Sequence, residues 1–435
     1  MASLNPARLT GLTGLARGGV AGLAGAGAGA AAQFLTVVVV TRGVGQETAG
    51  LFFSGTALCL AVATVLRLDA GNGLVYFIAR SRSPGHRHTS GTSGYVRAAL
   101  VPVAALSLAT GAAVVLTTSD LVLRVLAVAL PAVACSGVVV SATRGFGSMR
   151  PTVLLDGVLQ PVAQLLLVGV VVLTGRDSVP LLATAWALPY LPVLLLASVW
   201  LRRRLPRSPR APGTARDLWR HTWPRSLASG IQAVFQRLDV VIVAVLAGPA
   251  EAAVYTAATR FKIVGQLAGQ GLAQATQPGL VRALAEGDLP RARELYQSAT
   301  LWLVLLTWPV WLGYAALAPW LLGAVFGDGY TGGAPVAFVL AATMMLATAC
   351  GMADVVLTSA GHTGSSLVNL VAAVATAVTL DLLLIPSTGS LGAALGWAGG
   401  TVVKNLLPLW RIHRLYGLRP FGTHSLAALN PRWAP

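Results

Sequence analysis

The sequence has few charged residues and no hydrophilic stretch long enough to form a soluble domain. Charged side chains make up 10% of the 435 residues, against roughly 25% in an ordinary soluble protein. Hydrophobic residues make up 55%, and apolar runs of about 20 residues, the length that crosses a bilayer, recur along the chain. The short alternating segments of a membrane β-barrel do not dominate. This composition predicts an all-α polytopic membrane protein.

Residues that build metal and catalytic sites are also scarce. Cys59, Cys135 and Cys350 each fall in an apolar segment, and an odd number at such places argues against disulfides and metal ligation. The six histidines show no zinc-like pairing. The predicted outer loops are short, whereas a membrane glycosyltransferase or polymerase is expected to carry a large acidic one. We therefore predict no catalytic residue, no cofactor, no metal and no enzymatic activity.

Twelve membrane spans are predicted, with fourteen left open as an alternative count. The second and eighth are long enough to tilt strongly or to bend, and several prolines lie inside spans, where neighbouring helices tolerate kinks. The predicted spans are residues 17–41, 50–79, 95–117, 120–142, 152–174, 178–201, 225–247, 250–279, 296–324, 334–359, 363–385 and 388–412.

The net charge of +17 follows the predicted topology. If the N-terminus is inside, nearly all loop arginines lie on the cytoplasmic side, and only Arg42 and Arg176 lie outside. This asymmetry satisfies the positive-inside rule and predicts a multi-pass protein of the bacterial cytoplasmic membrane with both termini cytoplasmic. Contact with anionic membrane lipids is the other use of this charge. A nucleic-acid partner is not expected, because the longest basic run lies between two spans.

The spans are predicted to form two six-helix lobes. Residues 1–201 form the N-terminal lobe, 202–224 a basic cytoplasmic linker, 225–415 the C-terminal lobe and 416–435 a cytoplasmic tail. The stretch from Gln33, QFLTVVVVTRGVGQETAGLFFSGTA, aligns without gaps to QRLDVVIVAVLAGPAEAAVYTAATR from Gln236, with a shared turn at Gly45 and Gly248. Because each half has an even number of spans, the repeats are parallel and related by a pseudo-twofold along the membrane normal.

Three stretches resemble a known transporter family. RLDVVIVAVLAGPAEAAVYTAATRFKIVGQ resembles the seventh-to-eighth span region of bacterial polysaccharide-biosynthesis flippases, in the multidrug/oligosaccharidyl-lipid/polysaccharide exporter superfamily. PGLVRALAEGDLPRARELYQSATLWLV resembles the cytoplasmic connection that follows, and FLTVVVVTRGVGQETAGLFFSGTAL resembles the first helix pair. With the span count, the resemblance covers roughly residues 10 to 415.

The resemblance implies two lobes in a V around a central cavity that opens to one side at a time. It implies movement of an undecaprenyl-pyrophosphate-linked saccharide from the inner to the outer leaflet, with that lipid-linked saccharide and membrane lipids as partners. Other polysaccharide-assembly proteins are left open as partners, and a monomer is expected. Related branches export drugs or flip lipid II, so a drug or metabolite antiporter and a lipid II flippase remain the alternatives.

Ionisable side chains inside the predicted spans are the first candidates for a site. A charge at the bilayer centre costs about 2.5–3.5 kcal/mol on insertion scales, so such residues usually face a cavity or a partner. The deepest cations, which are suited to a pyrophosphate, are Arg67, Arg237 and Lys262. The candidates for ion or proton coupling are Asp239, Asp69 and Asp156. For Arg237 and Asp239, the alternative is structural ion pairs with neighbouring helices.

A stripe of glutamines follows Lys262 in KIVGQLAGQGLAQATQPG. Steps of three or four place Gln266, Gln270, Gln274 and Gln277 on one face of a helix. The fifth span adds Gln160 and Gln164. Amides both donate to and accept from hydroxyls, so these residues are predicted to line a path for a saccharide. The alternative is hydrogen bonding between packed helices, and Gly265, Gly269 and Gly271 are expected to provide close packing beside the stripe.

Overall fold

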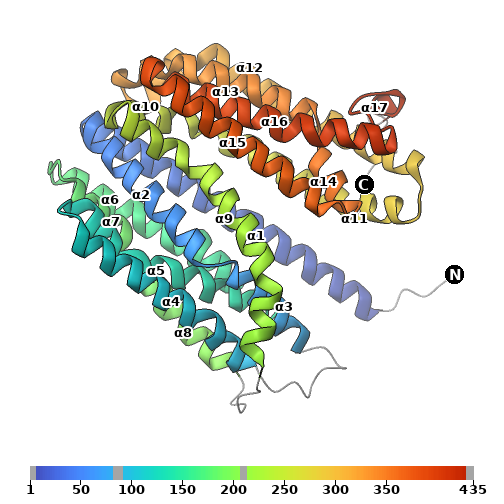
Figure 1. Ribbon diagram of the computed structural model, residues 1–435, viewed down its shortest axis with the longest axis horizontal. Helices are drawn as coiled ribbons and strands as arrows, with labels where there is room; N and C mark the ends of the chain where they lie inside the picture. The colour runs from blue at the N-terminus through green and yellow to red at the C-terminus, as the bar shows by residue number, and fades with distance from the viewer. Residues whose placement is uncertain (1–5, 82–91, 206–212, 428–435) are drawn as a thin grey trace. The chain divides into compact units, whose positions relative to one another are not determined.

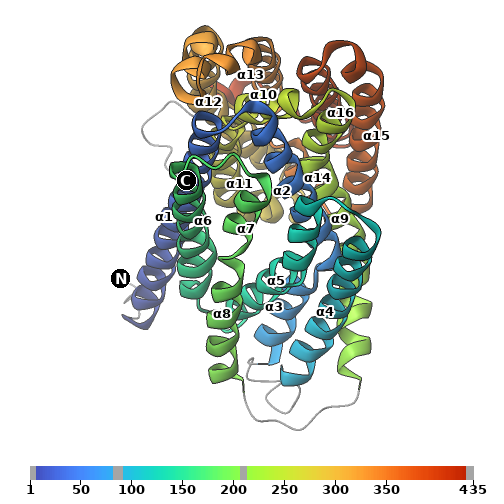
Figure 2. The ribbon, with the colours of Figure 1, turned by 90° about the vertical axis from the view of Figure 1, so that its left-hand side faces the viewer.

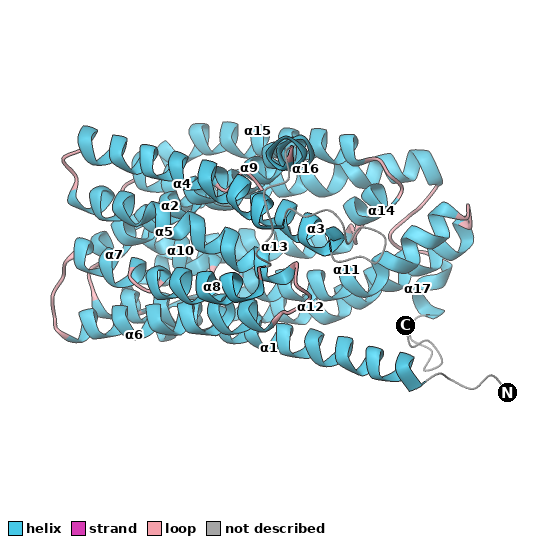
Figure 3. Ribbon diagram, turned by 90° about the horizontal axis from the view of Figure 1, so that it is seen from below, coloured by secondary structure: helices cyan, strands magenta, loops and turns pink. Residues whose placement is uncertain are grey.

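The computed structural model describes the backbone of residues 6–81, 92–205 and 213–427. Side chains are not described for residues 6–24, 426 and 427, nor for ten single positions in α9, α11 and α15: 224, 225, 228, 234, 264, 266, 267, 270, 274 and 363. The described residues form helices joined by short loops and contain no β-strand (Figure 3). The predicted all-α class is thereby confirmed.

The chain divides into two compact units, Met1–Arg237 and Leu238–Pro435. The division falls inside a helix, α9 (Thr214–Leu246), whose first part belongs to the first unit and whose last part belongs to the second. The sequence placed the division in the basic segment 202–224 instead, and that assignment of lobes stays a prediction. Each unit is described here by itself.

The first unit is built around α5. Its elements are α1 (Pro6–Gly43), α2 (Gln46–Leu66), α3 (Ala70–Ser81), α4 (Thr92–Thr117), α5 (Leu121–Arg144), the π-helix η2 (Thr152–Leu159), α6 (Gln160–Leu173), α7 (Val179–Ala187), α8 (Tyr190–Arg204) and most of α9 (Figure 1). Helix α5 packs against α2, α3, α4, α7 and α8. Its side chains Val133, Ala134 and Val138 are almost fully buried, so α5 supplies the core of this unit.

Glycines bring α1 close to its neighbours η2 and α6, beside which it runs (Figure 2). A Cβ atom added at Gly29 would lie 2.6 Å from the carbonyl oxygen of Gly157, and one added at Gly25 would lie 2.5 Å from Val153. Membrane helices associate through this kind of close packing of small residues, because lipid supplies no hydrophobic driving force between them. Gly25 and Gly29 are therefore packing positions on the face of α1 that meets η2.

The second unit contains the end of α9, then α10 (Pro249–Thr259), α11 (Lys262–Ala285), α12 (Leu289–Phe326), the 3-10 helix η3 (Asp328–Gly333), α13 (Ala334–Ala349), α14 (Ala353–Ser359), α15 (Thr363–Thr388), α16 (Ser390–Tyr416) and α17 (Thr423–Ala427). Helix α16 packs against α10, α13, α14 and α15, and α12 packs against α11 and α13. Two buried clusters hold these helices, one around Tyr296 and Leu357 and one around Trp311 and Leu340.

Each of the twelve predicted spans coincides with a helix or with a broken pair of helices. Nine stretches of the described residues are long and apolar enough to cross a membrane. The three other predicted spans, 225–247, 250–279 and 388–412, fall on α9, on α10 with α11, and on α16. The predicted bends are present, because the second span breaks between α2 and α3 and the eighth between α10 and α11.

The helix bounds follow the predicted repeat at its turn. An offset of 203 residues carries Gly43, the end of α1, onto Leu246, the end of α9, and Gln46, the start of α2, onto Pro249, the start of α10. The two shared glycines differ in conformation: Gly248 has a φ of 95°, which favours glycine, whereas Gly45 has an ordinary extended backbone with φ −61°. The correspondence ends further on, because the two second helices break at different distances from this turn.

Candidate functional site

Asp239 is a buried carboxylate near the end of α9. Its side chain is 8% exposed. One carboxylate oxygen, Oδ2, accepts a hydrogen bond of 2.6 Å from the hydroxyl of Tyr255 on α10, and the other, Oδ1, accepts one of 2.9 Å from the backbone N–H of Val240. A charge can be buried only if such partners replace its lost water, so these bonds hold Asp239 in place and tie α9 to α10.

Lys262 lies beside this carboxylate because α11 begins with it. Two turn residues, Arg260 and Phe261, separate α10 from α11. The ammonium Nζ lies 3.8 Å from Asp239 Oδ2, 4.2 Å from the ring centre of Trp397 on α16 and 5.5 Å from that of Tyr255. An ammonium so placed is attracted both by the carboxylate and by the negative faces of the rings.

Asp381 on α15 is a second buried acid in the same neighbourhood. It is 3% exposed and lies within electrostatic range of Asp239 and Lys262. Within the described part of the chain, its Oδ1 has no hydrogen-bond donor, and a Cβ added at Gly396 of α16 would collide with that atom. We call Asp239, Tyr255, Lys262, Asp381 and Trp397 the acid–lysine cluster. The guanidinium of Arg260 also lies within electrostatic range of Lys262, so two acids and two basic groups share this neighbourhood.

Sequence reasoning selected Asp239 and Lys262 from this cluster but missed Tyr255, Asp381 and Trp397. Asp381 had a signal, because it is an acid inside the predicted span 363–385 and meets the criterion that selected Asp239. Tyr255 and Trp397 had none, since an aromatic residue in a membrane helix is ordinary.

In the first unit, four predicted residues share one polar region. Tyr190, which is 4% exposed at the start of α8, lies beside Gln164 and within electrostatic range of Arg67 and Arg237. Asp156 on η2 is exposed and also lies within range of Arg67. We call Arg67, Asp156, Gln164, Tyr190 and Arg237 the basic cluster. Both arginines are half-buried.

Arg67 is anchored on α5. Its Nη2 donates a hydrogen bond of 2.8 Å to the carbonyl of Val133, and its guanidinium covers Gly137, where an added Cβ would collide with it. Its buried Nε has no acceptor among the described residues. A guanidinium carries five N–H donors, so this anchorage orients the side chain without using all of them.

Gln164 of the basic cluster and two other predicted residues, Asp69 and Gln160, have partners within the fold or are only half-buried. Gln164 is buried, and its Nε2 donates 2.9 Å to the carbonyl of Trp186 on α7, which is the packing role that the sequence left open. Asp69 lies at the break between α2 and α3 and accepts a hydrogen bond of 2.7 Å from the Asn72 amide. Gln160, at the start of α6, is half-buried.

The glutamine stripe lies on one unbroken helix, α11, as its spacing predicts. The side chains of Gln266, Gln270 and Gln274 lie outside the described residues, and Gln277 is exposed. The expected close packing holds at Gly265, where an added Cβ would collide with Met344 and Trp311. At Gly269 and Gly271 nothing described lies within 4 Å of an added Cβ, so close packing there stays a prediction.

Comparisons with known proteins agree with this architecture. Residues 15–283, more than half of the chain, match the family model described as polysaccharide biosynthesis protein. No curated protein sequence matches the chain.

Three solved structures share the fold. An inward-facing multidrug-resistance MATE transporter of the MOP superfamily has a TM-score of 0.70 and 19% identity, covering 89% of this chain and 94% of that one. The lipid II flippase MurJ, in an inward closed conformation, has a TM-score of 0.67 and 10% identity, covering 94% and 90%. A MOP-superfamily transporter from Pyrococcus furiosus, described as having a binding pocket of reverse polarity, has a TM-score of 0.58 and 17% identity, covering 92% and 95%.

These likenesses confirm the predicted fold of twelve membrane helices in two lobes. The family model confirms the resemblance drawn from the sequence. The chain therefore belongs to the polysaccharide biosynthesis protein family, with the fold of the MOP-superfamily transporters and flippases.

Proposed function

We propose that this protein moves a polyprenyl-pyrophosphate-linked oligosaccharide, the precursor of a surface polysaccharide, across the bacterial cytoplasmic membrane by alternating access. The observation that carries the proposal is the basic cluster, which holds two half-buried arginines in one polar region of the first unit. Guanidinium groups form charge-assisted, often bidentate hydrogen bonds with phosphate oxygens. A cationic cargo would be repelled by them, and a neutral cargo would accept hydrogen bonds that lack the added attraction between opposite charges. Membership in a polysaccharide-biosynthesis family favours a saccharide as the rest of the cargo.

The acid–lysine cluster supports a coupling step. With Asp239 ionised, Lys262 Nζ is held 3.8 Å from the carboxylate. A proton or cation taken up between Asp239 and Asp381 would cancel that attraction and release Lys262, the first residue of α11. The glutamine stripe, which is predicted to line the path of the saccharide, lies on the same helix. Ion binding would therefore act on that path by moving α11.

Transport of a labelled lipid tests the proposal. The full-length protein is reconstituted in vesicles containing a fluorescent polyprenyl-diphosphate oligosaccharide, and a membrane-impermeant quencher reports how much of it reaches the outer leaflet. We expect transport by the wild type and a loss of about tenfold or more in the variant Arg67→Gln/Arg237→Gln, because each charge-assisted bond is worth about 1.5–3 kcal/mol. Arg97→Gln, at an exposed arginine of α4 outside the cluster, is the matched control. Wild-type transport by the double variant would refute the role of the basic cluster.

The second candidate function is a drug or metabolite antiporter. The buried pair of Asp239 and Asp381 favours it, because acids attract cationic compounds, and the likeness to the MATE transporter fits it. Export of a cationic dye from the same vesicles, abolished by Asp381→Asn and unaffected by Arg67→Gln/Arg237→Gln, would establish the antiporter and refute the flippase.

A further inference from the structure

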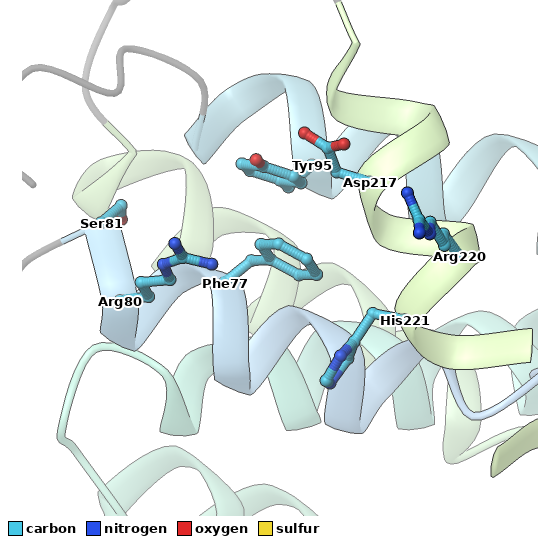
Figure 4. A pocket seen from close by; sticks show the side chains of 7 residues that line it. All are labelled: Phe77, Arg80, Ser81, Tyr95, Asp217, Arg220 and His221. Atoms are coloured by element: carbon cyan, nitrogen blue, oxygen red, sulfur yellow. The ribbon is translucent and has the colours of Figure 1, made fainter. Parts of the chain in front are cut away.

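A cavity of about 540 Å³ lies in the first unit, and none of its lining residues belongs to the basic cluster. Its lining comes from the end of α3, the start of α4 and the start of α9: Phe77, Arg80, Ser81, Tyr95, Asp217, Arg220 and His221 (Figure 4). We call these residues the headgroup pocket. All three helices begin or end here, and the predicted topology places these ends at the cytoplasmic face of the membrane.

The walls of the pocket are fixed by contacts between the three helices. The indole N–H of Trp219 on α9 donates 3.2 Å to the carbonyl of Ala98 on α4, and the hydroxyls of Ser81 on α3 and Thr92 on α4 are 3.3 Å apart. Thr222 of α9 fits against Gly73 of α3, where a Cβ would collide with it. The cavity is therefore a built feature of the packing.

Three aromatic rings line the pocket, those of Phe77, Tyr95 and His221, and Tyr76 stacks behind His221 without lining it. The rings of Phe77 and Tyr95 stack with centres 4.6 Å apart, and those of Tyr76 and His221 stack with centres 4.5 Å apart. Phe77 also meets His221 edge to face at 5.6 Å. Such a surface attracts a cation through the ring faces and tolerates the methylene groups of a small organic ligand.

The charges of the pocket are of both signs. Arg80 points from α3 towards Phe77, and Asp217 and Arg220 lie three residues apart on α9, on the other side of Phe77 in this view (Figure 4). All three side chains are exposed, and among the described residues the structure gives none of them an ion pair with another. A simple anion would be attracted by the two arginines and repelled by Asp217. A ligand that carries a phosphate and an ammonium together satisfies all three.

We propose that the headgroup pocket binds a phosphate–ammonium group, the chemistry of phosphoethanolamine, with the phosphate on Arg80 and Arg220 and the ammonium beside Asp217 and the aromatic rings. The group has two sources, a zwitterionic phospholipid of the inner leaflet and a free phosphoester. The position of the pocket favours the lipid. Tyr76 and Trp223, which are one and two residues from the lining residues Phe77 and His221, are 44% and 68% exposed, and tyrosine and tryptophan are enriched at the depth of the lipid headgroups. The site is independent of the proposed transport function.

Native mass spectrometry of the purified full-length protein tests this proposal. The protein is delipidated in detergent and offered equal amounts of phosphatidylethanolamine and phosphatidylglycerol. We expect phosphatidylethanolamine to be retained about threefold more, the size expected of one exposed ion pair. Asp217→Asn should remove this preference, whereas Arg80→Gln/Arg220→Gln should lower retention of both lipids about tenfold, because both lose their phosphate contacts.

Controls separate the pocket from general charge effects and from misfolding. Arg216→Gln removes an exposed arginine of α9 that does not line the pocket, and it should retain lipid as the wild type does. Each variant must melt as the wild type does. Soluble phosphoethanolamine that binds the delipidated protein as tightly as the lipid identifies the free phosphoester as the source, and failure to bind while the lipid is retained identifies the lipid. Equal retention of the two lipids by the wild type, or wild-type retention by both pocket variants, overturns the proposal.

Discussion

Asp239 shows at the scale of one residue how this protein keeps a carboxylate inside a membrane helix. Two donors, the Tyr255 hydroxyl and the Val240 N–H, replace the water that the group loses, and the ammonium of Lys262 adds its charge. Removing one partner of a buried charge costs more than the bond itself is worth, because the remaining group is left without solvent. The Tyr255 hydroxyl should therefore be essential to the stability of the second unit.

We expect Tyr255→Phe to lower the free energy of unfolding by about 1–3 kcal/mol. The melting temperature can be measured with a thiol-reactive dye, because Cys59 and Cys350 are buried and Cys135 half-buried, so the dye reports unfolding.

Tyr330→Phe is the matched control for this change. The Tyr330 hydroxyl is buried but has no hydrogen-bond partner among the described residues, so its loss should leave stability unchanged or raise it slightly. Equal melting temperatures for Tyr255→Phe and the wild type would show that the bond to Asp239 contributes nothing.

The sequence reveals single candidate residues of the site, but it does not reveal which residues from distant parts of the chain contact them. The cost of burying charge makes Arg67, Asp239 and Lys262 visible as single letters in apolar runs. Asp381 is visible in the same way, but its proximity to Lys262, like that of Trp397, is not, because both lie more than 100 residues away from Lys262 in the chain and meet it only through helix packing. The roles of Gln160 and of the glutamine stripe stay predictions.

At the scale of helices, the packing of α1 on η2 depends on Gly25 and Gly29, and Gly27 on the same helix provides a comparison. Gly29 has no room for a side chain, whereas nothing described lies within 4 Å of a Cβ added at Gly27. Both glycines belong to the same helix and differ only in the face they occupy. This contrast gives a clean comparison of close packing against helix propensity.

We expect Gly29→Val to lower the free energy of unfolding by about 1–3 kcal/mol or more, because the added methyl groups force α1 away from Gly157. Gly27→Val should have little effect or a small stabilising one, since valine favours a helix slightly over glycine. Melting with the thiol-reactive dye measures both. If the two variants have the same melting temperature, the close approach of α1 and η2 does not contribute to the stability of this helix pair.

The helix breaks show that the sequence can predict a bend in a long span without predicting its position. Length alone predicted that the second and eighth spans either tilt strongly or bend. The positions of the breaks were not predicted, because neither has glycine or proline at its turn: Leu68 and Asp69 take φ values of 49° and 51° without glycine. Such a conformation costs an ordinary residue about 1–2 kcal/mol, which tertiary contacts, such as that of Ser226 with the carbonyl of Leu68, must offset.

At the scale of the whole molecule, the division between the units follows contacts and not composition. The basic segment 202–224 attracts attention because it is polar. The first part of α9, however, packs on α3 and α4 through Thr222 and Trp219, so it belongs to the first unit. A polar loop marks where the chain leaves the membrane, whereas a structural unit ends where packing ends.

The topology of the chain, with both termini cytoplasmic, is a prediction that thiol labelling of whole cells can test. In a variant without the three native cysteines, Arg176→Cys should react with a membrane-impermeant maleimide in intact cells, because it lies in a predicted outer loop. Arg291→Cys, near the start of α12, should react only after permeabilisation. Both positions are exposed, so access to the reagent, and not burial, decides the result.

The physical reason for this expectation is the asymmetry of the arginines. Short loops rich in arginine are retained on the cytoplasmic side during insertion, and Arg291 belongs to such a loop, whereas Arg176 is one of two loop arginines on the opposite side. Consecutive spans alternate in direction, so fixing the side of one loop fixes the side of every other loop. Labelling of Arg291→Cys in intact cells together with protection of Arg176→Cys would place the termini outside, and the headgroup pocket would then face the outer leaflet.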